Sequence, residues 1–324
     1  MNTLRAQAWA LFDQIVATAP ARDFNPWFRD DDGSARFEPD YQTLCRLLGV
    51  PLLLKAVSQS GVPALALDVW VAYELRRAGF DPERVWPRAS APRVLPSEIT
   101  TFVAGLPVRQ RTDLVARIAR GSGGSSSANI LGKNYVKQVD VVMSSWATGP
   151  ELLVSTKRMD SSFGKNAANR VEESYGDAKN LRSRHPQAAL GFFYALGAAA
   201  LDSEPDSARW LIDLLGKLGR EADAYDAVGL IIPIMTSDAP DSTSEEDPAG
   251  PLEAGVTESI HDDQPQLDVS DEDLTHLPVV SLQRGAVPAE LDPGRFLGIM
   301  CSLVLDRTPV NFHVEARARL QAAQ

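Results

Sequence analysis

The chain has 324 residues, 44% of them hydrophobic, so it is long enough to bury a large core in one or two domains. No apolar run reaches the 18 residues that a membrane-spanning helix needs, and the first residues lack the basic-then-apolar order of a signal peptide. Two cysteines, Cys45 and Cys301, exclude a disulfide framework, and no cysteine or histidine pair has zinc spacing. We therefore expect a cytoplasmic protein without a membrane span.

The net charge of −11 is unevenly distributed along the chain. Residues 238–273 contain thirteen acidic residues and no Lys or Arg, and without them the net charge would change from −11 to +2. The acidic total therefore does not exclude nucleic-acid binding, which depends on where Lys and Arg cluster. Residues 237–278 have no aromatic residue and are rich in Asp, Glu, Ser and Pro, which predicts an acidic, disordered insertion.

Residues 1–120 are predicted to form a mostly helical N-terminal region for recognition or dimerisation. Apolar residues recur at helical spacing in residues 4–18, 41–58, 62–78 and 108–120, and Ser97 begins a further helix. Pro51 is expected to begin a second helical segment within 41–58, and Gly79 is expected to end the helix over 62–78. Gly and Ser residues over 121–127 predict a flexible linker or a mobile loop.

Two apolar, β-branched runs, 137–143 and 151–159, are separated by Gly149 and Pro150 and predict a β-hairpin. Asp140 and Lys157 should then lie on neighbouring strands. A carboxylate or an ammonium group is costly to bury alone in an apolar strand. The two residues therefore either pair with each other or serve an exposed site.

The alternation of strands and helices continues after the hairpin. A helix is predicted over 166–184, an almost wholly apolar strand over 188–195, a helix over 206–218 and a strand over 227–235. Pro233 indicates an edge or the end of that last strand. This pattern predicts an α/β core in residues 121–236. Helices over 293–306 and 310–323 should return residues 279–324 to the core or form a dimer surface.

The order of these elements resembles the core of the PD-(D/E)XK superfamily, the restriction-endonuclease-like nucleases. The matching residues are Val139-Asp140 on one strand and Ser155-Thr156-Lys157 on the next, and the resemblance covers roughly residues 110–235. It implies a restriction-endonuclease-like central mixed sheet that is flanked by helices.

The chain departs from the family at Ser155, where most members have Asp or Glu two residues before the lysine. Some restriction enzymes of the superfamily similarly lack this carboxylate and take it from the following helix, in the pattern Ser-x-Lys, about a dozen residues, then Arg-x-x-Glu. This chain has Ser155-Thr-Lys157, twelve residues and Arg170-Val-Glu-Glu173, which resembles that variant. Glu172 remains an alternative to Glu173.

The resemblance implies Mg²⁺-dependent hydrolysis of phosphodiester bonds in double-stranded DNA, with Mn²⁺ as a possible substitute. Hard oxygen ligands suit Mg²⁺, and Lys157 would orient the attacking water and stabilise charge at the phosphate. The implied catalytic residues are Asp140, Lys157, Glu173, Glu172 and Ser155. The implied metal ligands are Asp140, Glu173 and the carbonyl of Thr156. The implied phosphate contacts are Arg158, Lys165 and Arg170.

At the level of biology, the resemblance implies a type II restriction endonuclease or a related defence nuclease. A homodimer is expected, because two symmetric sites are the simplest way to cut both strands of a duplex. The missing carboxylate at Ser155 keeps open a catalytically inactive nuclease-fold module that binds DNA or a protein. A repair or RNA-processing nuclease would share the chemistry and differ in its substrate.

Overall fold

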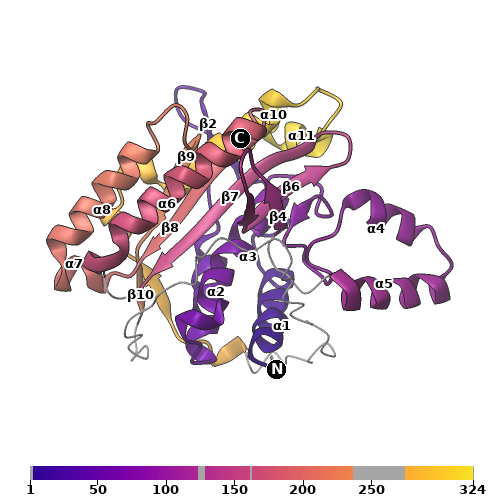
Figure 1. Cartoon of the computed structure of the whole chain (residues 1–324), viewed down its shortest axis with the longest axis horizontal. Helices are drawn as coiled ribbons and strands as arrows, with labels where there is room; N and C mark the ends of the chain where they lie inside the picture. Colours follow the sequence, from indigo (N-terminus) through magenta and orange to yellow (C-terminus); the bar gives the residue numbers. More distant parts are fainter. Residues whose placement is uncertain (1–2, 123–127, 161–162, 236–273, 324) are drawn as a thin grey trace.

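The computed structural model describes residues 3–122, 128–160, 163–235 and 274–323. At its centre is a mixed five-stranded sheet in the order β3-β6-β7-β8-β9, with helices on both faces (Figure 1). The strands are β3 (Val85–Trp86), β6 (Val141–Ser145), β7 (Gly149–Met159), β8 (Ala189–Leu196) and β9 (Ala227–Ile231). Strands β3, β6 and β7 pair antiparallel, whereas β7, β8 and β9 pair parallel. The predicted α/β class, a central mixed sheet flanked by helices, is confirmed.

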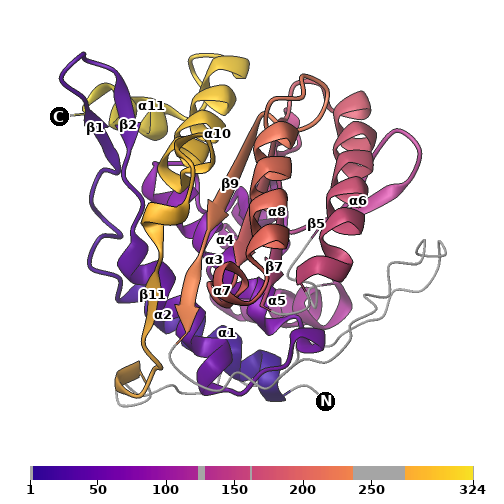
Figure 2. The same ribbon diagram turned by 90° about the vertical axis from the view of Figure 1, so that its left-hand side faces the viewer.

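One face of the sheet is covered by α6 (Phe163–Arg184) and α8 (Pro205–Leu218), with the short α7 (Ala199–Ser203) before α8. Parallel neighbours need a crossover connection, and α6 and α8 supply those from β7 to β8 and from β8 to β9. Figure 2 shows the two helices side by side, on the other side of β9 from the C-terminal helix α10. Leu181 and Leu211 pack there against Phe192 in one buried apolar cluster.

The other face is covered by α3 (Val62–Arg77) and α10 (Pro293–Arg307), with α1 (Thr3–Ala17) and α2 (Tyr41–Leu53) packed beside α3. The rings of Trp70 and Phe193 lie 5.3 Å apart, and those of Phe193 and Phe296 lie 5.2 Å apart. Residues from 1–120, 121–236 and 279–324 therefore share one apolar core. The predicted boundary at residue 120 does not separate two cores, since β3 also belongs to the central sheet.

Two predicted strands are broken in the structure. The run 137–143 bends at Asp140, so that β5 (Val136–Val139) pairs with β4 (Ala128–Leu131) outside the central sheet and β6 begins at Val141. The run 227–235 is interrupted at Ile232, and β10 (Pro233–Met235) pairs instead with β11 (Val280–Leu282). Pro233 has no N–H to donate, so the strand leaves the sheet where the sequence predicts an edge or an end.

The remaining elements lie at the periphery of this core. Strands β1 (Trp27–Arg29) and β2 (Ala35–Phe37) form a hairpin, and α4 (Ser97–Ala104) with α5 (Val108–Ser122) forms an arm that projects from the body (Figure 1). The shorter helices are η1 (Ser58–Ser60), η2 (Arg284–Ala286), η3 (Ala289–Leu291) and α11 (Val314–Gln321). Pro51 lies inside α2 instead of opening a new helix, while Gly79 follows α3 with a φ of 93°, as a helix stop requires.

The acidic insertion predicted over 237–278 falls mainly on residues outside the described ranges. No helix in the described ranges combines the length and apolar character needed to cross a membrane.

We expect Gly229→Ala to lower the free energy of unfolding by about 1–3 kcal/mol, the usual effect of overpacking a core. A Cβ atom at Gly229 would lie 2.6 Å from the Phe193 ring and 3.0 Å from the Phe296 ring. Urea unfolding measures the change. The control is Gly176→Ala, because Gly176 is exposed on α6 with open space around it. Gly176→Ala should leave the free energy of unfolding unchanged or raise it, because alanine is more favourable than glycine in a helix by about 1 kcal/mol. An equal loss of stability in both variants would contradict this account of the core.

Candidate functional site

Asp140 lies at the break between β5 and β6, beside the strand that carries Lys157. The ladder between β6 and β7 ends at the pair Val141 and Val154, and β7 continues beyond it without a β6 partner, paired with β8 on its other side. The backbone N–H of Thr156 donates a hydrogen bond of 2.8 Å to Oδ2 of Asp140, which replaces the missing strand partner. The N–H and the carbonyl of a strand residue point to the same neighbour, so the carbonyl of Thr156 also points toward this edge.

Lys157 and Ser155 lie on the face of β7 that α6 covers, because side chains alternate between the two faces of a strand. The Ser155 hydroxyl is buried and hydrogen-bonded to Tyr225, whose own hydroxyl donates to the carbonyl of Ser174 at 3.0 Å. The Lys157 side chain is half-buried, and no hydrogen bond or ion pair ties its ammonium group to another described residue. Burial raises the pKa of Asp140, and the charge of Lys157 opposes that rise. Because Val141 pairs with Val154, Asp140 lies beside the part of β7 that carries Lys157, as the hairpin pattern predicts.

Glu173 and Asp177 extend this cluster from α6. The ammonium nitrogen of Lys137, on β5, lies 2.5 Å from Oδ2 of Asp177 and 3.3 Å from Oε1 of Glu173. Burial opposes the charge of Lys137, but the hydrogen bond and the charge of Asp177 raise its pKa. The Asp177 side chain is 9% exposed and that of Glu173 is 38% exposed. Glu173 is therefore the more accessible of the two carboxylates.

Burial raises the pKa of Asp140, and the charge of Asp177 adds to the rise. The hydrogen bond from Thr156 and the charges of Lys157 and Lys137 act in the opposite direction. Asp177 on α6 is thus within electrostatic range of Asp140. Asp140 is the point at which groups from β5, β7 and α6 meet.

Glu172 and Glu173 point to different surroundings. Glu172 is exposed and lines a surface groove between α6 and α8, together with Tyr175 and Trp210. Glu173 lies on the flank of α6 that reaches Lys137. Of these two adjacent carboxylates, the structure brings Glu173 to Lys137 on β5, the strand that ends just before Asp140, and leaves Glu172 on the outer side of the helix.

The expectation that Arg158 contacts phosphate needs correction. Arg158 follows Lys157 on an extended strand, so its side chain lies on the opposite face of the sheet. It is 5% exposed, its Nε lies 2.7 Å from Oδ2 of Asp160, and it also donates to the carbonyl of Pro63. These contacts bury Arg158 and occupy it within the protein. The side chains of Lys165 and Arg170 lie outside the described residues, so their phosphate contacts stay a prediction.

Asp68, on α3, is a site neighbour that the sequence analysis did not identify. It is 5% exposed, and the Thr156 hydroxyl donates a hydrogen bond of 2.5 Å to its Oδ1. Burial raises the pKa of Asp68 well above the usual range, and the negative charge of Asp140 raises it further. The one sequence signal was a carboxylate within the otherwise uncharged run 62–73, which is costly to bury without partners.

The donor set at this edge consists of oxygen atoms, which is the chemistry that Mg²⁺ prefers. Asp140 and Glu173 offer carboxylates, and Thr156 offers a carbonyl. Within the described ranges, no three side chains of His, Cys, Asp or Glu come together closely enough to hold a metal ion by themselves. Mg²⁺ keeps several water ligands and is commonly bound through one or two carboxylates, so these residues fit it.

Comparisons with known proteins leave the function to be inferred from these residues. The chain matches no protein-family model, no curated protein and no solved structure.

We expect Asp68→Asn to make the metal-free protein more stable at neutral pH. Asn keeps the size of the side chain and an oxygen that can accept from Thr156, and it removes the buried charge. A carboxyl group whose folded pKa is raised contributes most stability below its unfolded pKa, about 4, and loses it as the pH rises through the folded pKa. The advantage of the variant should therefore shrink toward pH 4.

Thermal unfolding in EDTA between pH 4 and pH 8 measures this difference. The control is Asp223→Asn, since a hydrogen bond from Lys179 lowers the pKa of Asp223 and this exposed carboxylate should show no such advantage. A variant at Asp68 that is less stable than the wild type by the same amount at every pH would contradict the expectation.

Proposed function

We propose that the chain is a Mg²⁺-dependent endonuclease that hydrolyses phosphodiester bonds in double-stranded DNA. The observation that carries the proposal is the Asp140 carboxylate, which is fixed to the backbone of β7 one residue before Lys157, whose ammonium group has no partner in the described part of the chain. The order β6, β7, α6 and β8 supports a restriction-endonuclease-like fold, because an antiparallel pair leads through a helix to a parallel strand. A type II restriction enzyme or a related defence nuclease, acting as a homodimer, is part of the proposal.

In this proposal Asp140, Glu173 and the Thr156 carbonyl hold Mg²⁺. When bound, the metal would neutralise phosphate charge and lower the pKa of water. Lys157 orients the attacking water and stabilises the negative charge that develops at phosphorus, since its ammonium group has no other partner among the described residues. The Ser155 hydroxyl is hydrogen-bonded to Tyr225 and supports the strand instead of acting as a ligand.

Glu173 can leave Lys137 at little cost in this arrangement. Lys137 holds Asp177 at 2.5 Å and Glu173 only at 3.3 Å, so its charge stays compensated when Glu173 turns away. The partly exposed Glu173 side chain has room for that rotation. Lys137 and Asp177 then act as a fixed pair that keeps the first part of α6 beside β5.

The arm formed by α4 and α5 is the DNA-backbone contact that we propose beside this site. Helix α5 contains Arg109, Arg111 and Arg117 but only one acidic residue among its described side chains, Asp113. Arg109 and Arg117 are exposed, and eight residues on a helix leave their directions about 80° apart, within one half of its circumference. Arginines on one face of an element are the usual footprint of phosphate binding.

A catalytically inactive module that binds DNA or a protein is the second candidate. The observation in its favour is Ser155, whose buried hydroxyl bonded to Tyr225 occupies the position of the usual strand carboxylate. This candidate keeps DNA binding through the arm and lacks metal-dependent cleavage.

Lys157→Ala should lower the rate of DNA cleavage by at least about 100-fold, the usual effect of removing one charge-stabilising donor. Glu173→Gln should also abolish most cleavage, because it removes a proposed metal ligand. Glu172→Gln, on the outer side of α6, is the matched control and should cleave like the wild type. The assay is digestion of unmethylated plasmid and phage DNA with Mg²⁺, Mn²⁺ or EDTA. If the wild type binds DNA but cleaves neither DNA nor RNA with either metal, the nuclease proposal is wrong and the inactive binding module is the remaining candidate.

The double variant Arg109→Gln and Arg117→Gln should weaken DNA binding and reduce the salt dependence of the binding constant by up to about two charges. Fluorescence anisotropy with a duplex at several salt concentrations, in EDTA, measures both quantities. The control is Arg209→Gln, because Arg209 is exposed on α8, outside the arm, and pairs with Asp206 on its own helix as Arg117 pairs with Asp113. An unchanged salt slope in the double variant would exclude the arm as a phosphate contact, whatever the cleavage assay gives.

A further inference from the structure

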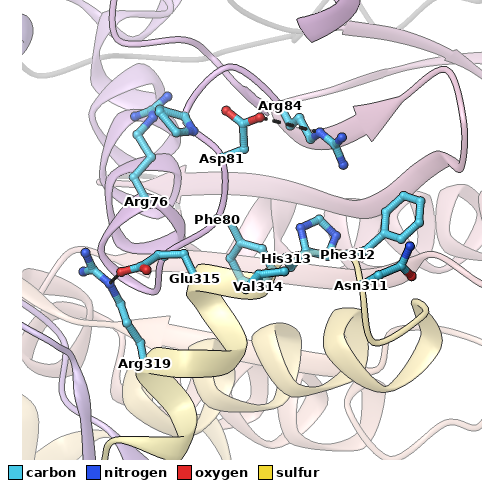
Figure 3. A pocket seen from close by; sticks show the side chains of 12 residues that line it. Arg76, Phe80, Asp81, Arg84, Asn311, Phe312, His313, Val314, Glu315 and Arg319 are labelled. Carbon is cyan, nitrogen blue, oxygen red and sulfur yellow. Dashed lines mark hydrogen bonds and ion pairs between the residues drawn. The ribbon is translucent and has the colours of Figure 1, made fainter.

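A cavity lies between the C-terminal end of α3 and the segment that leads into α11, apart from the candidate nuclease site (Figure 3). Its volume is about 610 Å³, within the range of small-molecule sites. Three arginines contribute to its lining, Arg76, Arg84 and Arg319. None of the lining residues belongs to the nuclease site proposed above.

Two of these arginines have a buried Nε that no described residue accepts from. Arg76 donates through Nη2 to the carbonyls of Val85 and Pro87, but no carboxylate oxygen of a described residue lies within 4.0 Å of it. The buried Nε of Arg84 also lacks a hydrogen-bond partner, and its ion pair with Asp81 is 3.6 Å long. A buried donor on a cation is costly to leave unpaired. Arg319, in contrast, is satisfied by Glu315 at 2.9 Å and by the carbonyl of Arg77 at 2.7 Å.

The carboxylates near Arg76 are used by other arginines. Asp13 pairs with Arg93 at 2.7 Å, and Glu83 pairs with Arg88 at 2.5 Å. Burial and the charge of Arg93 together lower the pKa of Arg76 to about 10. Among the described residues, Arg76 is therefore left without a carboxylate in ion-pair distance, and this favours an anionic ligand beside it.

The other wall of the cavity is aromatic (Figure 3). The rings of Phe80 and His313 meet edge to face with centroids 5.1 Å apart, and the guanidinium carbon of Arg84 lies 5.9 Å from the centre of the half-buried Phe312 ring. Nε2 of His313 lies 2.9 Å from Oε2 of Glu151, which fixes this wall to β7. Phe80 and the His313 side chain are only 2% exposed, so the ring on which a flat ligand can stack is that of Phe312. The exposed amide of Asn311, also in the lining, offers a donor and an acceptor.

We propose that this cavity binds a nucleotide, with the phosphate on Arg76 and Arg84 and the base against Phe312. The combination of arginines and an aromatic ring determines the ligand class. A site with arginines alone would bind any small anion, and a site with an aromatic ring alone would bind any apolar ring. The nucleotide can be a free mononucleotide or the terminal nucleotide of a nucleic acid. This proposal does not depend on the nuclease proposal.

Isothermal titration of the full chain with AMP, GMP, CMP and UMP tests the proposal, with inorganic phosphate and adenosine as partial ligands. At least one mononucleotide should bind, and more tightly than phosphate or adenosine. Arg84→Gln should weaken its binding at least about tenfold, as should Phe312→Leu, which keeps an apolar side chain and removes the ring. Arg209→Gln should bind like the wild type, and unfolding temperatures check that each variant is folded.

A 5′-phosphorylated oligonucleotide, titrated in EDTA, distinguishes the two sources. Tighter binding than the mononucleotide, with the same loss in both variants, assigns the cavity to a nucleic-acid end. Weaker binding than the mononucleotide assigns it to a free nucleotide. Absence of mononucleotide and oligonucleotide binding, equal binding of phosphate alone, or binding unchanged in both folded variants would overturn the proposal. The readout is binding, so it does not depend on whether Lys157 supports cleavage.

Discussion

The hydrogen bond from the Thr156 amide to the Asp140 carboxylate is the contact on which the candidate site depends. Strand β7 extends beyond the end of β6, and its backbone would otherwise lack a partner on that side. Backbone amides in protected positions are almost always paired, so Asp140 completes the sheet with a side chain where no strand is present. The chain bends at Asp140 for the same reason. A negative charge is thereby held at the sheet edge, beside Lys157.

Charge compensation then organises both faces of this edge. Asp68 approaches from α3 through the Thr156 hydroxyl, and Asp177 approaches from α6 through Lys137. Burial raises the pKa values of both Asp140 and Asp68. The charge of Asp177 raises that of Asp140 further, and the charge of Asp140 raises that of Asp68 further, as expected for like charges that are buried together. A divalent cation at the edge would reverse this trend, because its charge favours ionised carboxylates.

Much of this arrangement follows from local sequence patterns. The strands β7 and β8 and the helices α6 and α8 are predicted close to their observed bounds, since their apolar spacing reports their faces directly. The hairpin pattern also predicts that Asp140 and Lys157 are neighbours. The opposite orientation of Arg158 was predictable too, because adjacent residues on a strand face opposite ways. The break at Asp140 and the approach of Asp68 were not, since they depend on contacts with Thr156 that span 16 and 88 residues.

The candidate edge and the arginine-lined cavity share two rigid elements. Asp68 and Arg76 are eight residues apart on α3, which is about 12 Å along a helix, and Glu151 and Lys157 are six residues apart on β7, which is about 20 Å along a strand. One strand of a nucleic acid rises about 3.4 Å per nucleotide, so roughly four to six nucleotides cover that separation. A nucleic-acid segment of this length matches that separation, whereas a mononucleotide is shorter than it. If both proposals hold, a nucleic-acid end bound in the cavity would therefore place one phosphodiester bond at a fixed distance, near Asp140 and Lys157.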